Sequence, residues 1–275
     1  MNITIEKKIS NKITNEEVKS LELRILIKVA EYCERNGLRY FLAYGTLIGA
    51  IRHEGFIPWD NDIDIFMPRP DYERLILLVK EQPISDRLTL LHYCDVRTFP
   101  FVKIVDNRTL LKEHFLRTED NCGVYIDIFP LDGLPDEACV QKRIFKKAKL
   151  YYTLYALANY RFNTGSTFLK KFIKNIFYPF SKLISNYKVC EKLNQLCQDY
   201  NYDKATYVGN IVWGEGEREI MPRIWYTEVN GKFENNFFYI PSGYDYILKK
   251  IYGEYMKIPP IDQQIVHEFE AEWKT

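Results

Sequence analysis

The chain has 275 residues, 47% of them hydrophobic and 15% aromatic, which is enough for one large or two modest domains with a real core. Its 38 Lys and Arg nearly balance its 37 Asp and Glu, so the net charge of +1 excludes nothing by itself. The distribution is informative, because the 53 positions from 138 to 190 hold eleven basic residues and no acidic one. The rest of the chain has 27 basic and 37 acidic residues. A basic segment inside an acidic chain indicates a partner surface.

The six cysteines are scattered along the chain. None belongs to a C-x-x-C pair or has a histidine at zinc-ligand spacing, and free thiols fit a reducing compartment. Residues 1–17 are polar and charged, without the apolar stretch of a secretory signal. The longest uncharged run of the basic segment, at 150–160, has 11 residues and is too short to span a bilayer. We therefore expect a cytoplasmic protein.

Helix and strand signals alternate through the first half of the chain. Thr14 and Glu17 form a capping box that begins a helix with apolar residues at helical spacing, and Gly37 ends it in the left-handed conformation. Further helices are expected at 46–52 and at 70–80, the second with Pro70 at its first position. The expected strands are 39–44, 62–67, 88–93, 99–105, 109–115 and 124–129, with Pro130 closing the last.

The second half begins with a helical, basic pattern from 136 to 200. Short strands are expected at 207–212 and 237–240, followed by a helix at 242–252 and a terminal helical stretch. This order predicts an α/β chain of the α+β type, with a mixed sheet and a basic, aromatic helical insertion or subdomain. We expect one catalytic domain over 1–275, with a core at 14–135, the helical region at 136–203 and a C-terminal part at 204–275.

Two carboxylates lie two residues apart in one expected strand. The alternation that turns Ile63 and Ile65 inward places Asp62 and Asp64 together on the other face, roughly 7 Å apart. Two like charges at this distance favour a cation between them, and Mg²⁺ takes such oxygen ligands together with substrate phosphates. The alternative interpretation is a solvated polar strand face.

A third carboxylate has the same setting in another expected strand, where Asp127 lies between Ile126 and Ile128. If the two strands are neighbours, Asp127 completes a three-carboxylate cluster, which is the arrangement for metal-assisted phosphoryl transfer. We expect Asp60 in a loop beside the cluster and Asp132 in a turn.

Gly45 and Thr46 stand where the first expected strand meets a helix. Glycine permits close backbone approach, and helix N-terminal amides favour a phosphate. Thr46 either adds a hydroxyl donor to that site or is the N-cap of the helix.

The residues from Gly45 to Arg69 read G-T-L-I-G-A-I-R-H-E-G-F-I-P-W-D-N-D-I-D-I-F-M-P-R and resemble the signature of the LicD family. That family belongs to the nucleotidyltransferase-fold superfamily and includes bacterial phosphocholine transferases and fukutin-type phosphoribitol transferases. Further resemblance lies at 101–106, 126–132, 240–244, 252–255 and 259–260. The resemblance therefore covers most of the chain outside the basic segment.

The resemblance implies a nucleotidyltransferase fold and a CDP-linked donor. Phosphocholine, or another phospho-alcohol, would pass to a sugar hydroxyl of a cell-surface glycan, teichoic acid or lipopolysaccharide precursor. Asp62 and Asp64 would bind Mg²⁺ or Mn²⁺, with Asp127 as the third acid or the general base.

The same resemblance nominates substrate-binding residues. Arg52 and Lys103 would balance diphosphate charge, with surface ion pairs as the alternative. Trp59 would form a wall of the pocket or simply pack, and His267 lies where the family often has a histidine, with a structural role equally open. Gly45 and Thr46 would contact phosphate.

The basic segment interleaves its cations with aromatic residues, a pattern typical of helices at a membrane interface. The family's lipid-linked acceptors fit an anionic membrane surface contacted through 138–190, at the inner face of the cell membrane. Nucleic acid is the rival partner, but no recognised binding motif accompanies the charge. A solvated basic face over an aromatic core is the remaining interpretation.

Two other functions stay open from the sequence. A D-x-D glycosyltransferase would use a nucleotide sugar, although it would need a longer βαβ unit before the acids. A non-catalytic membrane-docking protein with a vestigial pocket would not need its acids, and all three are intact.

Overall fold

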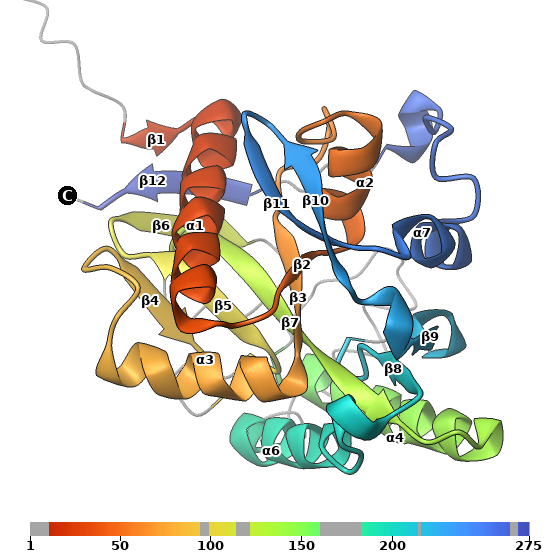
Figure 1. Cartoon of the computed structure of the whole chain (residues 1–275). Helices are drawn as coiled ribbons and strands as arrows, with labels where there is room; N and C mark the ends of the chain where they lie inside the picture. The colour runs from red at the N-terminus through yellow and green to blue at the C-terminus, as the bar shows by residue number, and fades with distance from the viewer. Residues whose placement is uncertain are drawn as a thin grey trace, which may run out of the picture.

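The computed structural model describes residues 11–93, 99–113, 122–159, 183–213, 216–264 and 269–274. The described helices are α1 (Asn15–Asn36), α2 (Tyr44–Arg52), α3 (Arg69–Glu81), α4 (Ala138–Ala158), α6 (Asn186–Cys197) and α7 (Tyr244–Tyr252). Short 3-10 helices are η1 (Tyr202–Lys204), η2 (Gly216–Glu219), η3 (Arg223–Trp225) and η4 (Ile261–Gln263). Helices and a mixed sheet together make a mixed α/β fold, as the sequence predicts (Figure 1).

The central sheet places five strands side by side. In spatial order these are β2 (Phe41–Leu42), β3 (Asp64–Pro68), β7 (Tyr125–Leu134), β5 (Val102–Asp106) and β4 (Leu88–Leu91). The β3–β7 pair is parallel, and the other pairs of this sheet are antiparallel. Past its pairing with β5, strand β7 continues and pairs with β8 (Tyr207–Gly209), which pairs with β9 (Met221–Pro222).

Two smaller sheets flank the central one. Strand β12 (Phe269–Trp273) lies between β1 (Lys12–Ile13) and β6 (Thr109–Glu113), so both ends of the described chain meet there (Figure 1). Strands β10 (Glu228–Phe233) and β11 (Asn236–Pro241) form an antiparallel pair.

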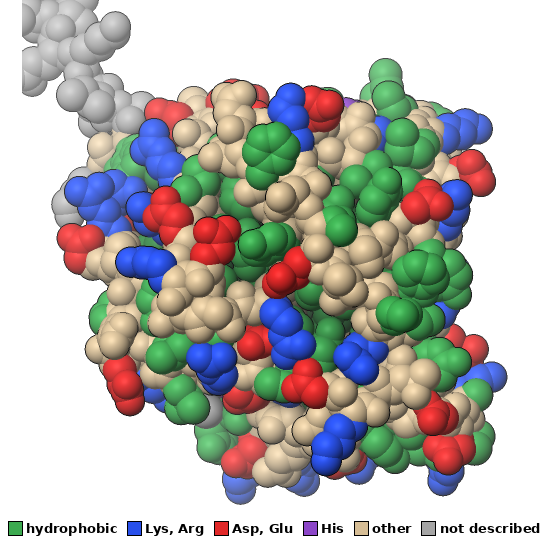
Figure 2. Space-filling view, in the orientation of Figure 1, with side chains coloured by type: hydrophobic (Ala, Val, Ile, Leu, Met, Phe, Trp, Pro, Cys, Tyr) green, Lys and Arg blue, Asp and Glu red, His purple; other side chains and the backbone are tan. Residues whose placement is uncertain are grey.

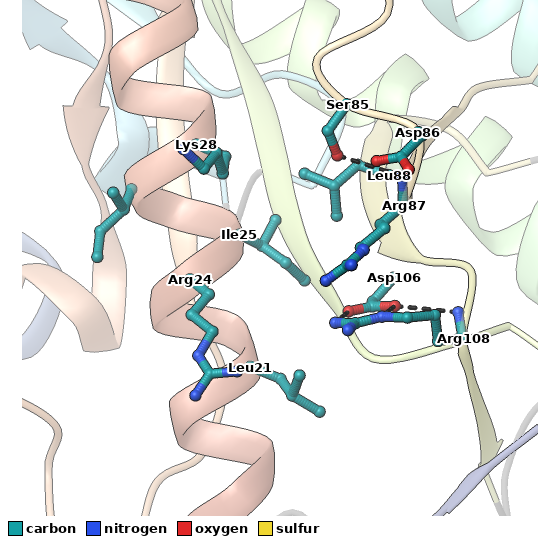
Figure 3. A pocket seen from close by; sticks show the side chains of 11 residues that line it. Leu21, Arg24, Ile25, Lys28, Ser85, Asp86, Arg87, Leu88, Asp106 and Arg108 are labelled. Atoms are coloured by element: carbon teal, nitrogen blue, oxygen red, sulfur yellow. Dashed lines mark hydrogen bonds and ion pairs between the residues drawn. The ribbon is translucent and has the colours of Figure 1, made fainter.

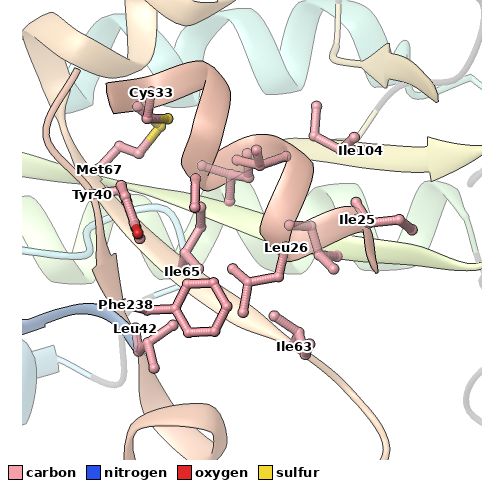
Figure 4. Packing of buried hydrophobic residues seen from close by; sticks show 14 of the residues in the cluster. Ile25, Leu26, Cys33, Tyr40, Leu42, Ile63, Ile65, Met67, Ile104 and Phe238 are labelled. Carbon is pink, nitrogen blue, oxygen red and sulfur yellow. The ribbon is translucent and has the colours of Figure 1, made fainter. Parts of the chain in front are cut away.

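Helix α1 covers one face of the central sheet, because its apolar residues recur at helical spacing. Ile25 and Leu26 pack there with Ile63 and Ile65 of the β3 region, and Ile104 of β5 joins them (Figure 4). Burial of each such side chain contributes about 1.5–3 kcal/mol. The predicted inward-facing isoleucines are therefore confirmed.

Both ends of α1 are as predicted. The Thr14 hydroxyl accepts a hydrogen bond from the Glu17 amide, while the Glu17 carboxylate accepts one from the Thr14 amide, at 3.3 and 2.8 Å. Gly37 follows the helix with φ of 60°, the left-handed conformation that glycine tolerates best. The capping box and the stop are confirmed.

The opposite face of the sheet carries a second core. It is formed by the side chains that alternate along the strands with those of the first core. Phe66 and Phe129 pack there against Phe145 of α4 and Leu193 of α6. Asp64 and Asp127 belong to this face, two residues before those phenylalanines. The carboxylates therefore lie where the aromatic core of this face ends.

The basic segment is described at 138–159 and 183–190. In α4 the cations Lys142, Arg143, Lys146, Lys147 and Lys149 are exposed. Phe145 and Tyr155 are buried, so these two aromatics pack inward and do not form the interfacial pattern expected for them. No helix in the described ranges is long and apolar enough to cross a bilayer. Basic and acidic side chains are intermixed over the face drawn in Figure 2.

The strand end predicted at Pro130 is wrong. Strand β7 passes through Pro130 to Leu134, because the proline falls between the part of β7 paired with β5 and the part paired with β8. Asp132, expected in a turn, is consequently inside the strand and fully buried, where it accepts a 2.6 Å hydrogen bond from Arg69 Nε.

Other boundaries differ as well. The terminal helical stretch is wrong where it is described, because β12 is a strand with Ala271 buried between Glu270 and Glu272. Strand β3 begins at Asp64, so Asp62 precedes it, and α2 begins already at Tyr44. Strand β10 was not expected, because its sequence has no strong strand pattern. Its antiparallel pairing with β11 makes it a strand.

Candidate active site

Three side chains form a row across three neighbouring strands. Parallel pairing of β3 with β7 places Asp64 opposite Asp127, and antiparallel pairing of β7 with β5 places Asp127 opposite Lys103. Lys103 Nζ donates to Asp127 Oδ1 at 2.6 Å. The predicted adjacency of the two acidic strands is confirmed. The register of β5 against β7 also brings Lys103 beside the two aspartates.

A cavity of about 800 Å³ opens over this row. Elements far apart in sequence contribute its walls, from the turn before β3 to α4, η2 and α7. Its lining includes Tyr44, Gly45, Trp59, Asp60, Asp62, Asp64, Lys103, Asp127, Tyr152, Trp213, Glu219 and Tyr252. Four aspartates, one glutamate, one lysine and one arginine line this aromatic cavity, and they favour a ligand with phosphate groups held through a cation.

Asp64 shows the electrostatic cost of this crowding. Burial raises the pKa of Asp64 well above its usual value, and the charges of Asp62, Asp127 and Asp60 raise it further, while Lys103 lowers it. Each neighbouring negative charge disfavours the ionised form, and a cation reverses that effect. Burial raises the pKa of Tyr252 on the cavity wall, and Asp64 adds to the rise.

The donor set fits Mg²⁺ at Asp62 and Asp64, because carboxylates crowded beside a cavity are the oxygen ligands that this ion takes. In the described part of the chain, no three His, Cys, Asp or Glu side chains converge closely enough to hold a metal ion. Mg²⁺ usually completes its shell with water and substrate phosphates, so two protein carboxylates suffice. A three-carboxylate metal site including Asp127 stays a prediction.

Gly45 and Thr46 lie in the first turn of α2, and they differ in position. Gly45 lines the cavity, where a Cβ would come within 2.7 Å of Asp60 Oδ2, so glycine allows this carboxylate to approach the helix. Thr46 is buried, and its hydroxyl accepts a 2.9 Å hydrogen bond from the Asp64 amide. The N-cap is Ala43, so Thr46 anchors the start of β3 and is not the cap.

Lys103 is buried, which excludes the surface ion pair as its explanation. Its ammonium lies 3.4 Å from the ring centre of Tyr125, with Phe99 and Phe101 at 5.2 and 5.3 Å. Aromatic faces attract a cation and here hold it beside Asp127.

Arg52 is not at the cavity. Its Nη1 donates to the carbonyl oxygen of Tyr255 at 2.5 Å and its Nε to His53, so it ties α2 to the segment after α7. The structure does not bring Arg52 into the cavity lining, and its contact with diphosphate stays a prediction. Trp59 lines the cavity, which agrees with the prediction that it forms a wall of the pocket. Arg52 lies over the Trp59 ring. His267 falls outside the described residues.

Several cavity residues were not found from the sequence. Trp213 and Glu219 come from the segment after α6, where no spacing signal marks them, and Tyr152 belongs to the basic segment. Glu22 of α1 is buried near the acids, and burial together with Asp62 and its neighbours raises its pKa well above the usual value. A signal for Glu22 existed, since it falls on the buried stripe of α1.

A second cavity, of about 390 Å³, lies between α1 and the turn before β4 (Figure 3). Arg24, Arg87 and Arg108 line it together with Asp86 and Asp106. Arg108 binds the Asp106 carboxylate through Nε and Nη2, so the principal buried charge of this cavity is already balanced. It does not contain the row of β3, β7 and β5.

The comparisons with known proteins place the chain in a family. A sequence profile described as LicD/FKTN/FKRP, nucleotidyltransferase domain, covers residues 37–158. The lipopolysaccharide cholinephosphotransferase LicD of Haemophilus influenzae is 32% identical over 268 residues, which make up 94% of this chain and 97% of that protein. The chain belongs to the LicD family. Human ribitol 5-phosphate transferase FKRP is 47% identical over 47 residues, 16% of this chain and 10% of that protein.

The LicD profile and the cavity overlap only in part. Asp62, Asp64, Lys103, Asp127 and Tyr152 lie inside the matched range. The walls contributed by 213–263 lie outside it. The shared LicD segment thus contains the acidic row, while the remaining walls come from the C-terminal part of this chain.

Proposed function

We propose that this protein is a phosphotransferase that moves phosphocholine, or another phospho-alcohol, from a CDP-linked donor to a sugar hydroxyl of a cell-surface glycan precursor. The observation that carries the proposal is the row of Asp64, Asp127 and Lys103, open to one cavity. Phosphoryl transfer depends on positioning, charge stabilisation and a base for the attacking hydroxyl, and this row offers groups for each. The transferase names of its LicD and FKRP relatives support the reaction class.

In the proposed reaction the sugar hydroxyl oxygen bonds to the phosphorus that carries the alcohol. The bond from that phosphorus to the CMP oxygen breaks, and CMP leaves with the electron pair. Asp127 accepts the hydroxyl proton, while Lys103 fixes the Asp127 carboxylate through Oδ1. Asp62 and Asp64 would hold Mg²⁺ or Mn²⁺, which would neutralise diphosphate charge when bound.

The other walls would position the donor. Gly45, in the first turn of α2, exposes the helix start to the cavity, and helix N-terminal amides favour phosphate. Thr46 does not reach the phosphate in this proposal. Its bond to the Asp64 amide sets the start of β3 and thereby the position of the acid.

The experiment is a donor panel with purified protein, Mg²⁺ and a sugar acceptor, scored by CMP release. CDP-choline, CDP-ethanolamine, CDP-ribitol and CDP-glycerol test the alcohol, and a nucleotide sugar tests the glycosyltransferase alternative. Release of CMP only with the CDP-alcohols supports the proposal. Sugar transfer from the nucleotide sugar, or silence with every CDP-alcohol, contradicts it.

The acceptor is proposed to be lipid-linked, with the protein at the inner face of the cell membrane. The exposed cations of α4 support contact with anionic lipid, each worth about 1 kcal/mol near such a surface. Co-sedimentation with vesicles of 30% phosphatidylserine in phosphatidylcholine, against vesicles of phosphatidylcholine alone, measures this. Replacement of Lys146 and Lys147 by Gln should weaken sedimentation, and equal sedimentation with both vesicles would contradict the contact.

A further inference from the structure

One wall of the cavity is aromatic and lies beside the acidic row. Trp213 contacts the rings of Tyr152, Phe101 and Phe129, with ring centres 5.3, 5.9 and 6.0 Å away. Tyr44 closes the group by an edge contact with Phe129 at 5.6 Å. We call Tyr44, Phe129, Tyr152 and Trp213 the aromatic box. All four line the cavity.

Within the box, Trp213 is the residue that faces open space. Trp213 keeps 44% of its surface exposed despite its three ring contacts. A ligand that covered the half-exposed indole would bury its apolar face, and that burial would stabilise the complex. Phe129 and Tyr44, by contrast, are held in the core around Phe66.

A buried carboxylate adjoins this box. Tyr44 Oη donates to Glu219 Oε2 at 3.2 Å, and Asn210 Nδ2 donates to the same phenol oxygen at 2.9 Å. Asn210 Oδ1 accepts from the Trp213 backbone amide at 3.1 Å, so one chain of hydrogen bonds joins the Glu219 carboxylate to the backbone of Trp213. Glu219 is buried and lines the cavity, and its exposed neighbour Arg218 lines the cavity as well.

The same wall already shows how it holds a cation. Lys103 lies over Tyr125, Phe99 and Phe101. Among the described residues, no Lys or Arg lies over the ring of Trp213, Tyr152 or Phe129. Within the described part of the chain, this second set of aromatic faces therefore has no Lys or Arg over its rings, although Arg218 lines the same cavity.

We propose that the aromatic box, with Glu219, is the subsite for the trimethylammonium group of the transferred phosphocholine. A quaternary ammonium has no proton to donate, so aromatic faces and a nearby negative charge are the groups that recognise it. Phe101 contacts both Lys103 and Trp213, so the box is one side chain away from the phosphate end of the site. In phosphocholine a two-carbon link likewise holds the ammonium group a short distance from the phosphate.

This inference rests on the proposed function for its substrate, but its test does not require turnover. Phosphocholine and its neutral isostere, the phosphate ester of 3,3-dimethylbutanol, are titrated against the whole chain by calorimetry. Wild-type protein should bind phosphocholine more tightly. Trp213→Leu should weaken phosphocholine binding about 10- to 30-fold, as expected for loss of a desolvated cation–π contact, and should leave CMP binding unchanged.

Matched variants separate recognition from folding. Trp213→Phe keeps an aromatic face and should restore most of the affinity. Trp225→Leu makes the same change at a tryptophan stacked on Tyr246, away from the cavity lining, and should have no effect. Glu219→Gln keeps the bond from Tyr44 but removes the charge, so it should reduce the preference for phosphocholine over the isostere.

Two results would overturn the subsite. One is equal loss of CMP and phosphocholine binding in Trp213→Leu, which would assign the box to the nucleobase. The other is equal affinity of wild-type protein for phosphocholine and its isostere. Failure of the donor panel with intact phosphocholine preference would overturn the proposed reaction and leave the subsite standing. If wild-type protein shows no preference for phosphocholine but transfers another phospho-alcohol, the subsite is overturned and the proposed reaction stands.

Discussion

Strand β7 carries two aspartates, each with a basic partner 2.6 Å away, and the two pairs differ in everything around them. Asp132 is fully buried against Arg69, whose Nη1 also reaches Asn194 and Glu73. Asp127 binds Lys103 at the wall of a cavity that holds three more aspartates. Distance alone does not separate a structural ion pair from a functional one. The difference lies in whether nearby charges are balanced within the protein.

The two ends of β7 also receive different packing. Around Asp132 the second core closes with Phe129, Leu131 and Leu134. Around Asp127 the sheet face opens, and three further aspartates line the same cavity. Buried charges are costly in both places, because water is removed from them. Only at Asp127 is the cost of like charges left for a ligand to relieve.

The largest effect is expected from Asp64→Asn. Loss of the charge should reduce CMP release by about 1,000-fold or more, since removal of one electrostatic group at a phosphoryl site commonly costs 10²–10³ and Asp64 is central to the row. Thermal unfolding should occur at an equal or higher temperature, because one like charge leaves a crowded group. Activity and melting are measured on the same preparation.

Asp86→Asn is the matched control for that variant. Asp86 is exposed and lines the second cavity, so the change should alter neither activity nor melting. A melting temperature lowered by several degrees in Asp64→Asn would show that Asp64 belongs with the structural pairs.

Arg69→Met tests the structural end. It leaves Asp132 buried without its guanidinium partner and should cost about 3–5 kcal/mol of unfolding free energy in urea. Arg39→Met, which removes a more exposed partner of Asp71, should cost less. The double change Arg69→Met with Asp132→Leu should recover much of the loss. An unfolding free energy near that of wild type for Arg69→Met alone would contradict a structural role for the Asp132–Arg69 pair.

Lys103→Met tests the functional pair in the same way. Asp127 loses the contact that orients it, and kcat should fall about 100-fold, the lower part of the range for proton-transfer and electrostatic groups. Water in the cavity can solvate Asp127, so the unfolding free energy should change less than in Arg69→Met. Lys142→Met, at an exposed pair with Glu217, is the control. Unchanged kcat with lost stability would exchange the roles of the two pairs.

The sequence was sufficient for features that depend on local pattern. The capping box of α1 and the alternation around Asp64 and Asp127 follow from neighbouring residues alone, and both are confirmed. The pattern Pro130-Leu131-Asp132 is local too, but it fits a turn as well as a strand. Pairing with β8, a distant segment, decides for the strand.

The site needed information that no single stretch contains. Asp64, Asp127 and Lys103 meet only because β3, β7 and β5 are adjacent in a set register. Arg52 has the same charge as Lys103 and lies in the family signature, yet it bonds Tyr255 because α2 turns that face toward the C-terminal segment. Trp213 and Glu219 reach the cavity through hydrogen bonds to Asn210 and Tyr44.

The smallest predicted effect concerns pH and again separates the two pairs. Burial raises the pKa of Asp132 to about 6, although Arg69 acts in the opposite direction. A carboxyl whose pKa is higher in the folded state binds protons more readily there, so its contribution to stability grows as pH falls from about 6 to 4 and is lost as pH rises. The whole contribution is at most about 3 kcal/mol. Urea unfolding of wild type and Asp132→Asn across this interval isolates it, because other carboxylates affect both proteins alike. Wild type should gain stability relative to the variant toward pH 4. If it loses stability instead, the attraction of Arg69 outweighs burial, and the pair at the closed end of β7 stabilises the fold through its charge.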